Sequence, residues 1–260
     1  MDNYILEIKK LNKHFPGVHA LKDVTITIRE GSIHSIVGEN GAGKSTLVNC
    51  IFGVYEEDSG EMLLQGERIK IKDTRMAMDK GISMIHQELH PVPYMSIMEN
   101  IWLGRYPKNK LKLIDKSRMY RDTQQLLKTI GFDVDPAMKV KDLSVSNIQL
   151  MEIAKAISYN AKVIIMDEPT SSLTMSETKT FFEIIKNLKS KGVSIIYISH
   201  KIEEVLEISD YITVMKDGET VGTWPASQLD ADFIISKMVG RTMDNRFPKH
   251  TTKLGDITLK

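Results

Sequence analysis

Residues 38–46 read Gly38-Glu39-Asn40-Gly41-Ala42-Gly43-Lys44-Ser45-Thr46. This stretch fits the pattern G-x-x-x-x-G-K-[ST], with the two glycines and the Lys44-Ser45 pair in the required places. Glycines let the backbone approach a polyphosphate, so that N–H groups and the start of the following helix face its negative charges. The stretch therefore predicts a loop that binds the phosphates of a nucleotide.

The flanks of this loop have the expected context. Residues 32–37 read as a strand that leads into it, and Leu47, Val48 and Ile51 have helical spacing after it. The first 40 residues as a whole read as strands, because polar and apolar side chains alternate through residues 24–29. Strand, glycine-rich loop and helix is the order that a phosphate loop requires.

The rest of the chain predicts a mixed α/β protein. The apolar runs at 163–166 and 193–198 are typical of parallel strands covered on both faces. A helix is expected between them at 175–190, and a hairpin at 211–224 that turns at 216–218.

The middle third differs in character from these strand-rich parts. Helical spacing at 115–130 and 146–159 indicates a helical insertion, which we place at about 88–160. The expected fold is thus a P-loop NTPase core with a mixed sheet flanked by helices, an N-terminal antiparallel β subdomain and a helical subdomain.

Composition restricts the function classes. The formal net charge is +1 with 27% charged residues, which gives no sign of general affinity for nucleic acid. The single cysteine, Cys50, lies in an apolar stretch and is expected to be a small buried side chain in a reducing compartment. There is no signal-peptide pattern at the start and no apolar run near the roughly 20 residues that span a bilayer. We expect a soluble cytoplasmic protein, in which any membrane role would come through a partner.

Further polar residues follow apolar strands, where side chains emerge at the ligand-binding edge of a sheet. Lys44 is expected near the outer phosphates and the Ser45 hydroxyl on Mg²⁺. Asp167 suits a contact to Mg²⁺, and Glu168 is placed to orient an attacking water. His200 becomes a candidate to contact the γ-phosphate and that water.

Together these segments resemble the ATPase subunit of an ABC transporter, over residues 4–247. Residues 38–46 match the Walker A motif, 163–168 the Walker B motif and 171–174 the D-loop. By this resemblance Gln87 is the Q-loop residue that contacts the nucleotide and Mg²⁺, His200 is the switch histidine, and Phe15 stacks on adenine. The resemblance implies ATP hydrolysis with Glu168 and His200 as catalytic residues, and an ABC ATPase domain over residues 1–241.

The signature segment departs from the usual Leu-Ser-Gly-Gly-Gln of this family. Here it reads Leu143-Ser144-Val145-Ser146-Asn147, and these residues are the expected contacts to the ATP of an opposite domain. Ser144 is retained as the residue for the γ-phosphate. Val145 in place of glycine removes conformational freedom and adds bulk where backbone should approach phosphate.

This variation is typical of the sugar-import branch. The runs at 102–107, 153–160 and 238–241 are similar to those of galactose/methyl-galactoside import ATPases, with ribose and xylose importers as close alternatives. The resemblance implies transmembrane permease subunits, a periplasmic-type sugar-binding protein as an indirect partner, and a peripheral place on the cytoplasmic face of the membrane. Such proteins are about twice this length, so residues 242–260 are expected to be a linker and the first strand of a missing second ATPase domain. Either that domain or a homodimer mate would complete the ATP site.

Two other protein classes fit the sequence less well. A soluble ABC-type protein acting on nucleic acid or ribosomes is disfavoured by the near-neutral charge, and we expect no nucleic-acid partner. A GTP-binding switch would need a guanine-reading Asn-Lys-x-Asp segment, which the sequence lacks.

Overall fold

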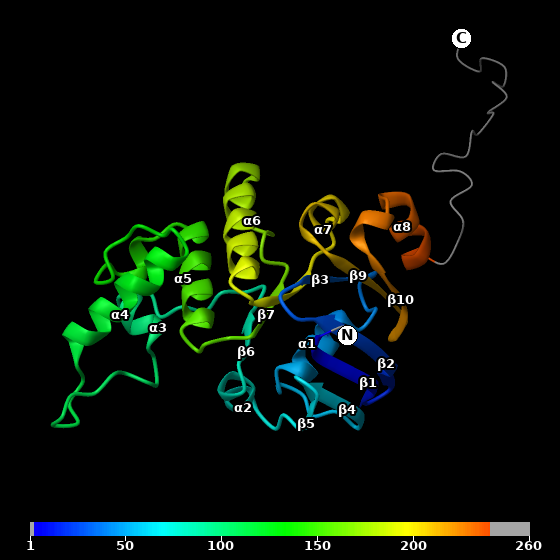
Figure 1. Cartoon of the computed structure of the whole chain (residues 1–260), viewed down its shortest axis with the longest axis horizontal. Helices are drawn as coiled ribbons and strands as arrows, with labels where there is room; N and C mark the ends of the chain where they lie inside the picture. Colours follow the sequence, from blue (N-terminus) through cyan, green and yellow to red (C-terminus); the bar gives the residue numbers. More distant parts are fainter. Residues whose placement is uncertain (1–2, 240–260) are drawn as a thin grey trace, which may run out of the picture.

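A computed structural model describes residues 3–239 of the chain (Figure 1). Its centre is a six-stranded sheet in the order β10-β9-β3-β8-β7-β6. The strands are β3 (Ile33–Val37), β6 (Ile82–Ile85), β7 (Val163–Asp167), β8 (Ser194–Ile198), β9 (Tyr211–Lys216) and β10 (Glu219–Pro225). All neighbours pair in parallel except β9 and β10, which form a hairpin, so the sheet is mixed.

A second, antiparallel sheet is built from the N-terminal part of the chain. It has the order β2-β1-β4-β5, with β1 (Tyr4–Phe15), β2 (Val18–Arg29), β4 (Ser59–Leu64) and β5 (Glu67–Ile69). This sheet packs together with α1 (Lys44–Ile51), and Cys50 is fully buried there as expected.

The central sheet has a separate core on each face. Along β8, Ile195 and Tyr197 enter one core, while Ile196 and Ile198 enter the other. The first core includes side chains of α5 (Val145–Ile157), α6 (Met175–Ser190), α7 (Ile202–Ile208) and α8 (Ala231–Val239), and the second includes α1 and α2 (Thr74–Asp79). This alternation explains why the strand sequences are apolar throughout, since both faces of a parallel sheet are covered.

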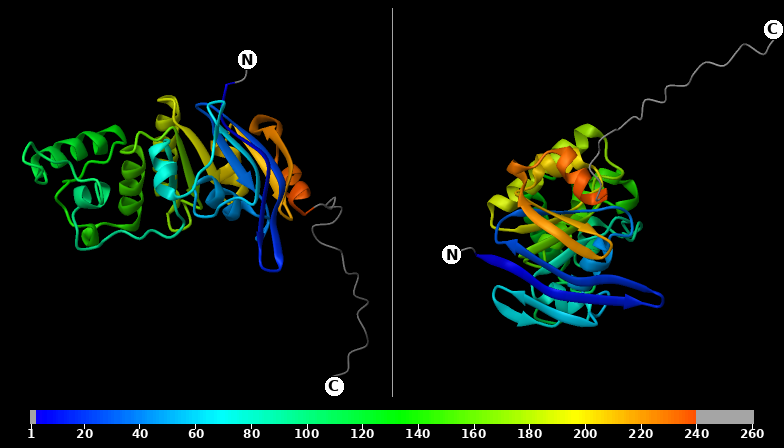
Figure 2. Two further views of the ribbon diagram at one scale, coloured as in Figure 1. Left: turned by 90° about the horizontal axis from the view of Figure 1, so that it is seen from below. Right: turned by 90° about the vertical axis from the view of Figure 1, so that its right-hand side faces the viewer.

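Helices α3 (Ile97–Ile101), α4 (Lys116–Thr129) and α5 lie between β6 and β7 in the chain. Figure 2 shows them grouped at one end of the molecule, away from the antiparallel sheet. Short 3₁₀ turns at Val140–Asp142 and Ala226–Gln228 complete the described elements. Among residues 3–239, none of the helices is both long and apolar enough to cross a bilayer.

Most predicted elements are confirmed. Helix α6 has the predicted bounds because Thr174 and Glu177 form a capping box at its start. Helix α5 begins one residue earlier than predicted, since Ser144 is its N-cap and accepts a hydrogen bond from the Asn147 N–H, and it ends two residues earlier. The expected linker and strand at 242–260, and part of the run at 238–241, lie outside the described residues.

Candidate functional site

Four parallel strands of the central sheet end at one edge. Pairing places Ile36 beside Ile198, Ile198 beside Asp167, and Ile85 beside Met166. The segments that follow β3, β6, β7 and β8 carry the glycine-rich loop, Gln87, Glu168 and His200 respectively. Residues far apart in sequence therefore meet because carboxyl ends of parallel strands share an edge.

A cavity of about 1010 Å³ lies at this edge. The predicted site residues on its wall are Phe15, Asn40, Gly41, Gly43, Lys44, Ser45, Thr46, Gln87, Asp167, Glu168 and His200. Of the other loop residues, Gly38 and Glu39 meet the Lys44 side chain through their carbonyls, and Ala42 is buried behind the loop. One cavity thus brings together residues that the sequence assigned to phosphate, metal and water.

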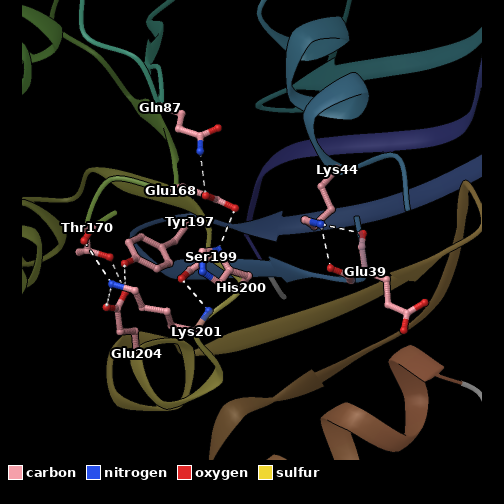
Figure 3. Close-up of polar contacts among 11 residues, drawn as sticks. Glu39, Lys44, Gln87, Glu168, Thr170, Tyr197, Ser199, His200, Lys201 and Glu204 are labelled. Atoms are coloured by element: carbon pink, nitrogen blue, oxygen red, sulfur yellow. Dashed lines mark hydrogen bonds and ion pairs between the residues drawn. The ribbon is translucent and has the colours of Figure 1, made fainter. Parts of the chain in front are cut away.

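Lys44 is held by the loop that precedes it. Its Nζ donates to the carbonyl oxygens of Gly38 at 2.8 Å and Glu39 at 3.0 Å (Figure 3). Burial lowers the pKa of this ammonium, while the carboxylates of Glu168 and Asp167 act in the opposite direction. Because an ammonium has three N–H donors, it can also donate to a phosphate oxygen in the cavity.

Two segments distant in the sequence fix the shape of the glycine-rich loop. Gly43 has a φ of 97°, and a Cβ there would lie 2.7 Å from the carbonyl oxygen of Ala20. A Cβ on Gly218, in the β9–β10 turn, would lie 2.8 Å from the same oxygen. Gly218 also accepts a hydrogen bond from Lys22 N–H and donates one to the Ala42 carbonyl. The loop is therefore clamped between the β2 strand and the β9–β10 hairpin.

Two residues that the sequence predicts for a divalent cation, Ser45 and Asp167, line the same cavity. The Ser45 hydroxyl donates a hydrogen bond to the Asp167 carboxylate, and both side chains line the cavity. Burial, and secondly the charge of Glu168, raise the pKa of Asp167, against the effects of Lys44 and Ser45. A hydroxyl and a carboxylate beside a phosphate site suit Mg²⁺, which takes oxygen ligands and is usually bound by one or two carboxylates together with substrate phosphates. The donor set therefore fits the expected cation.

Glu168 is held on both sides. Its carboxylate accepts from Gln87 Nε2 at 3.0 Å through one oxygen and lies 3.0 Å from His200 Nδ1 through the other (Figure 3). The Gln87 amide oxygen, which would meet a cation, is not used in that bond. The backbone of Glu168 has a φ of 46°, a left-handed conformation that a residue with a side chain rarely adopts. Such a conformation persists where the surroundings enforce it, and it is frequent at active sites.

The cavity is also lined by residues that the sequence did not assign to the site. They come from the start of β2 and from the β9–β10 turn, and are Val18, His19, Ala20, Lys22, Asp217 and Gly218. The β9–β10 turn was predicted as a hairpin turn but not as part of the site. Phe15 pairs with Val18 of β2 and meets Tyr55 edge-on, with ring centroids 5.1 Å apart.

The signature segment lies elsewhere. None of residues 143–147 lines the nucleotide cavity; Ser146 and Asn147 instead border a separate groove of about 160 Å³ between α5 and α6. Val145 occupies the first turn of α5 and is 50% exposed. Ser144 Oγ lies 2.9 Å from Ser146 Oγ, and Ser146 in turn hydrogen-bonds the Glu177 carboxylate. The predicted contacts of this segment to ATP therefore do not form within one chain.

Comparison with known proteins agrees with this geometry. The profile of the family described as ABC transporter matches residues 21–171. The whole chain is 52% identical to a galactose/methyl galactoside import ATP-binding protein of Clostridium tetani, and 99% of it is 49% identical to the corresponding protein of Escherichia coli. The chain spans 52% and 51% of these two relatives, or about half their length.

Solved structures show the same fold. An ATP-binding cassette of an ABC transporter in its ADP conformation superimposes with a TM-score of 0.80 at 26% identity, over 92% of this chain and 99% of that one. A dimeric cassette in a post-hydrolysis state with ADP and phosphate gives 0.70 at 25% identity, over 85% and 98%. With its family match, its relatives and the cavity at the sheet edge, the chain belongs to the ABC transporter family.

Proposed function

We propose that this chain is an ATP-binding and ATP-hydrolysing domain that powers import of a monosaccharide, galactose or a methyl galactoside. It would act through separate membrane permease subunits, from a peripheral place on the cytoplasmic face, with a sugar-binding protein delivering the cargo. The names of the relatives in Clostridium tetani and Escherichia coli support galactose or a methyl galactoside as the imported sugar. The observation that carries the activity is the Glu168 carboxylate, fixed between Gln87 and His200 in the cavity that also holds Lys44.

The geometry suggests a division of work. ATP binds with its triphosphate over the loop at 38–46 and its base toward Phe15, with Lys44 donating to the outer phosphates. Ser45, Asp167 and Gln87 would hold Mg²⁺, which neutralises phosphate charge when it is bound. Glu168 accepts a hydrogen bond and then a proton from the attacking water, whose oxygen bonds to the γ-phosphorus as the bond to the β–γ bridging oxygen breaks, leaving ADP and phosphate. His200 supports the Glu168 carboxylate and contacts the γ-phosphate.

We expect that a second ATPase domain is needed to complete the site. Ser144 and its neighbours lie outside the cavity of their own chain, on an exposed helix start where a second domain can meet them. Two domains would enclose two ATP molecules, each between the loop at 38–46 of one domain and the signature segment of the other. Closure on ATP and opening after hydrolysis would be transmitted to the permease, with the helical subdomain at about 88–160 as the contact.

The activity is tested with Glu168→Gln. Because the amide keeps the size of the side chain but is a poor proton acceptor, we expect ATP turnover to fall about 100-fold or more while ATP binding is retained. Glu183→Gln, on the exposed face of α6, is the matched control. Turnover that survives in Glu168→Gln would contradict the assigned role.

The need for a second domain is tested by varying protein concentration. Turnover per chain should be weak and should rise with concentration, because each complete site uses two domains. A rate that is independent of concentration and equal to that of a complete transporter would overturn this part of the proposal. Uptake assays with galactose, ribose and xylose in a strain that carries the permease would test the sugar.

A further inference from the structure

Glu204 on α7 gathers three donors from three segments of the chain. One carboxylate oxygen accepts from Thr170 Oγ1 at 2.5 Å and from the Tyr197 hydroxyl at 3.0 Å, and the other accepts from Lys201 Nζ at 2.9 Å (Figure 3). The side chain is 13% exposed, Tyr197 is fully buried and Thr170 is 1% exposed. A carboxylate with this many partners is fixed in place, because each donor restricts its rotation.

The donors lie next to the two residues that meet in the cavity. Thr170 is two residues after Glu168, and Lys201 directly follows His200. Lys201 Nζ also donates to the Thr170 carbonyl at 3.2 Å, so its ammonium bridges both segments. Glu204 itself does not line the nucleotide cavity. The network therefore ties the segment after Glu168 to the segment after His200, from outside the cavity.

Glu168 needs such support. Its left-handed backbone, with a φ of 46°, is unfavourable for a residue with a side chain and requires constraints on both sides. On one side its N–H donates to the Ile198 carbonyl at 2.9 Å. On the other side the Pro169 carbonyl accepts from the buried Gln149 amide, and Thr170 is held by Glu204.

We propose that Glu204 is a positioning residue for ATP hydrolysis. By anchoring Thr170 to α7 it keeps Glu168 in the left-handed conformation that brings its carboxylate to Gln87 and His200. The inference rests on the proposed function, in which Glu168 orients the attacking water. If the anchor is lost, residues 168–170 can relax toward ordinary backbone angles, and the carboxylate moves away from the reacting atoms.

The test is Glu204→Gln in the whole chain. The amide keeps the size of the side chain but removes the negative charge that Lys201 faces, and it cannot accept through both ends. We expect kcat to fall about 10- to 100-fold, as for a small misplacement of a catalytic group, with the KM for ATP unchanged within about twofold. Glu207→Gln, at an exposed position on the same helix, should behave as the wild type. An unchanged kcat, or a change confined to KM, would overturn the proposal.

A second measurement does not depend on turnover. The amides of Ser171 and Leu173 donate to the carbonyls of Glu168 and Thr170, so their hydrogen exchange reports the order of this segment. Exchange at 168–174 should accelerate about tenfold or more in Glu204→Gln but not in Glu207→Gln. Unchanged exchange would refute the anchor, even if the wild type proved inactive and the proposed function failed.

Tyr197→Phe provides a milder variant, should Glu204→Gln fail to fold. It removes one donor and leaves the carboxylate with Thr170 and Lys201. We expect a smaller loss of kcat, about two- to fivefold, in line with one weakened hydrogen bond of several. A wild-type kcat together with wild-type exchange in this variant would count against the network.

Discussion

Around the nucleotide cavity, side chains from four strand ends contact one another, whereas at the start of α5 the signature side chains contact α5 itself and α6. Lys44 is 8% exposed and Asp167 is buried, with pKa values displaced by that burial. Val145, in contrast, is half exposed, and the Ser144 hydroxyl meets Ser146 Oγ and the Asn147 N–H, both in the first turn of the same helix. The fold of a single chain brings the cavity residues into contact, whereas it leaves the signature residues exposed at the surface.

This contrast indicates how work is divided within the domain. Binding of phosphates and placement of the water can be specified by one chain, since their side chains already meet. Under the proposed function the signature residues act only when a second domain approaches, so they should affect turnover without affecting ATP binding by the single chain. Variants in the two regions should therefore separate binding from hydrolysis.

The largest effect is expected in the cavity, from Lys44→Ala. Loss of a charged donor to the phosphates should weaken ATP binding about 100-fold, because such hydrogen bonds contribute about 1.5–3 kcal/mol each. Titration calorimetry on the wild type, on Lys44→Ala and on the exposed control Lys80→Ala would measure this. If Lys44→Ala bound ATP as tightly as the wild type, the cavity residues would not differ from the signature residues in their effect on binding.

An intermediate effect is expected at the signature, from Ser144→Ala. ATP affinity should stay within about twofold, and turnover should fall about tenfold through loss of one hydroxyl donor to the γ-phosphate of the opposite site. Because Ser144 also caps α5, the change costs about 1 kcal/mol of stability.

Asp115→Ala is the matched control for this variant, since Asp115 caps α4 in the same way outside the site. It should cost similar stability and leave turnover intact. If Ser144→Ala instead weakened ATP binding by a single chain, the signature would have to belong to the same cavity.

The smallest effect concerns the pH dependence of stability. Since the folded pKa of Asp167 is raised above 3.8, the stability it contributes is present below that value and lost as the pH rises through the raised pKa. At pH 7 the nucleotide-free Asp167→Asn variant should thus melt at a higher temperature than the wild type, and the difference should shrink near pH 4.

Asp58 provides a control of opposite sign. Its hydrogen bonds from Lys13 and His14 lower its pKa to about 2, so its contribution is present above 3.8 and lost as the pH falls through 2. Asp58→Asn should lower the melting temperature at pH 7. Thermal melts of both variants at pH 7 and pH 4 would decide, and a lower melting temperature for Asp167→Asn at pH 7 would contradict the burial argument.

Much of the central sheet could be predicted because its signals are local. The apolar run at 163–166 can only be a covered strand or a buried helix, and its short length favours the strand. The Thr174–Glu177 capping box fixes the start of α6 in the sequence itself. The cavity residues at the strand ends could be predicted as well, because the carboxyl ends of parallel strands lie at the same edge of a sheet.

The cavity residues from β2 and the β9–β10 turn could not be predicted in this way. Ala20 and Gly218 approach the glycine-rich loop only through sheet pairings between distant segments, which leave no local pattern. Glu204 follows Glu203 on α7, and nothing in the sequence tells the partly buried carboxylate from the exposed one. The left-handed backbone of Glu168 is likewise imposed by its tertiary neighbours.

The carbonyl of Ala20, which lies between Gly43 and Gly218, has a consequence for biosynthesis. A chain emerging from the ribosome has made its glycine-rich loop long before the β9–β10 turn that clamps it. Because domains fold as units, the loop should acquire its final shape only when nearly the whole domain has been translated. Nascent chains that stop before Gly218 would then carry the complete motif and still fail to retain ATP.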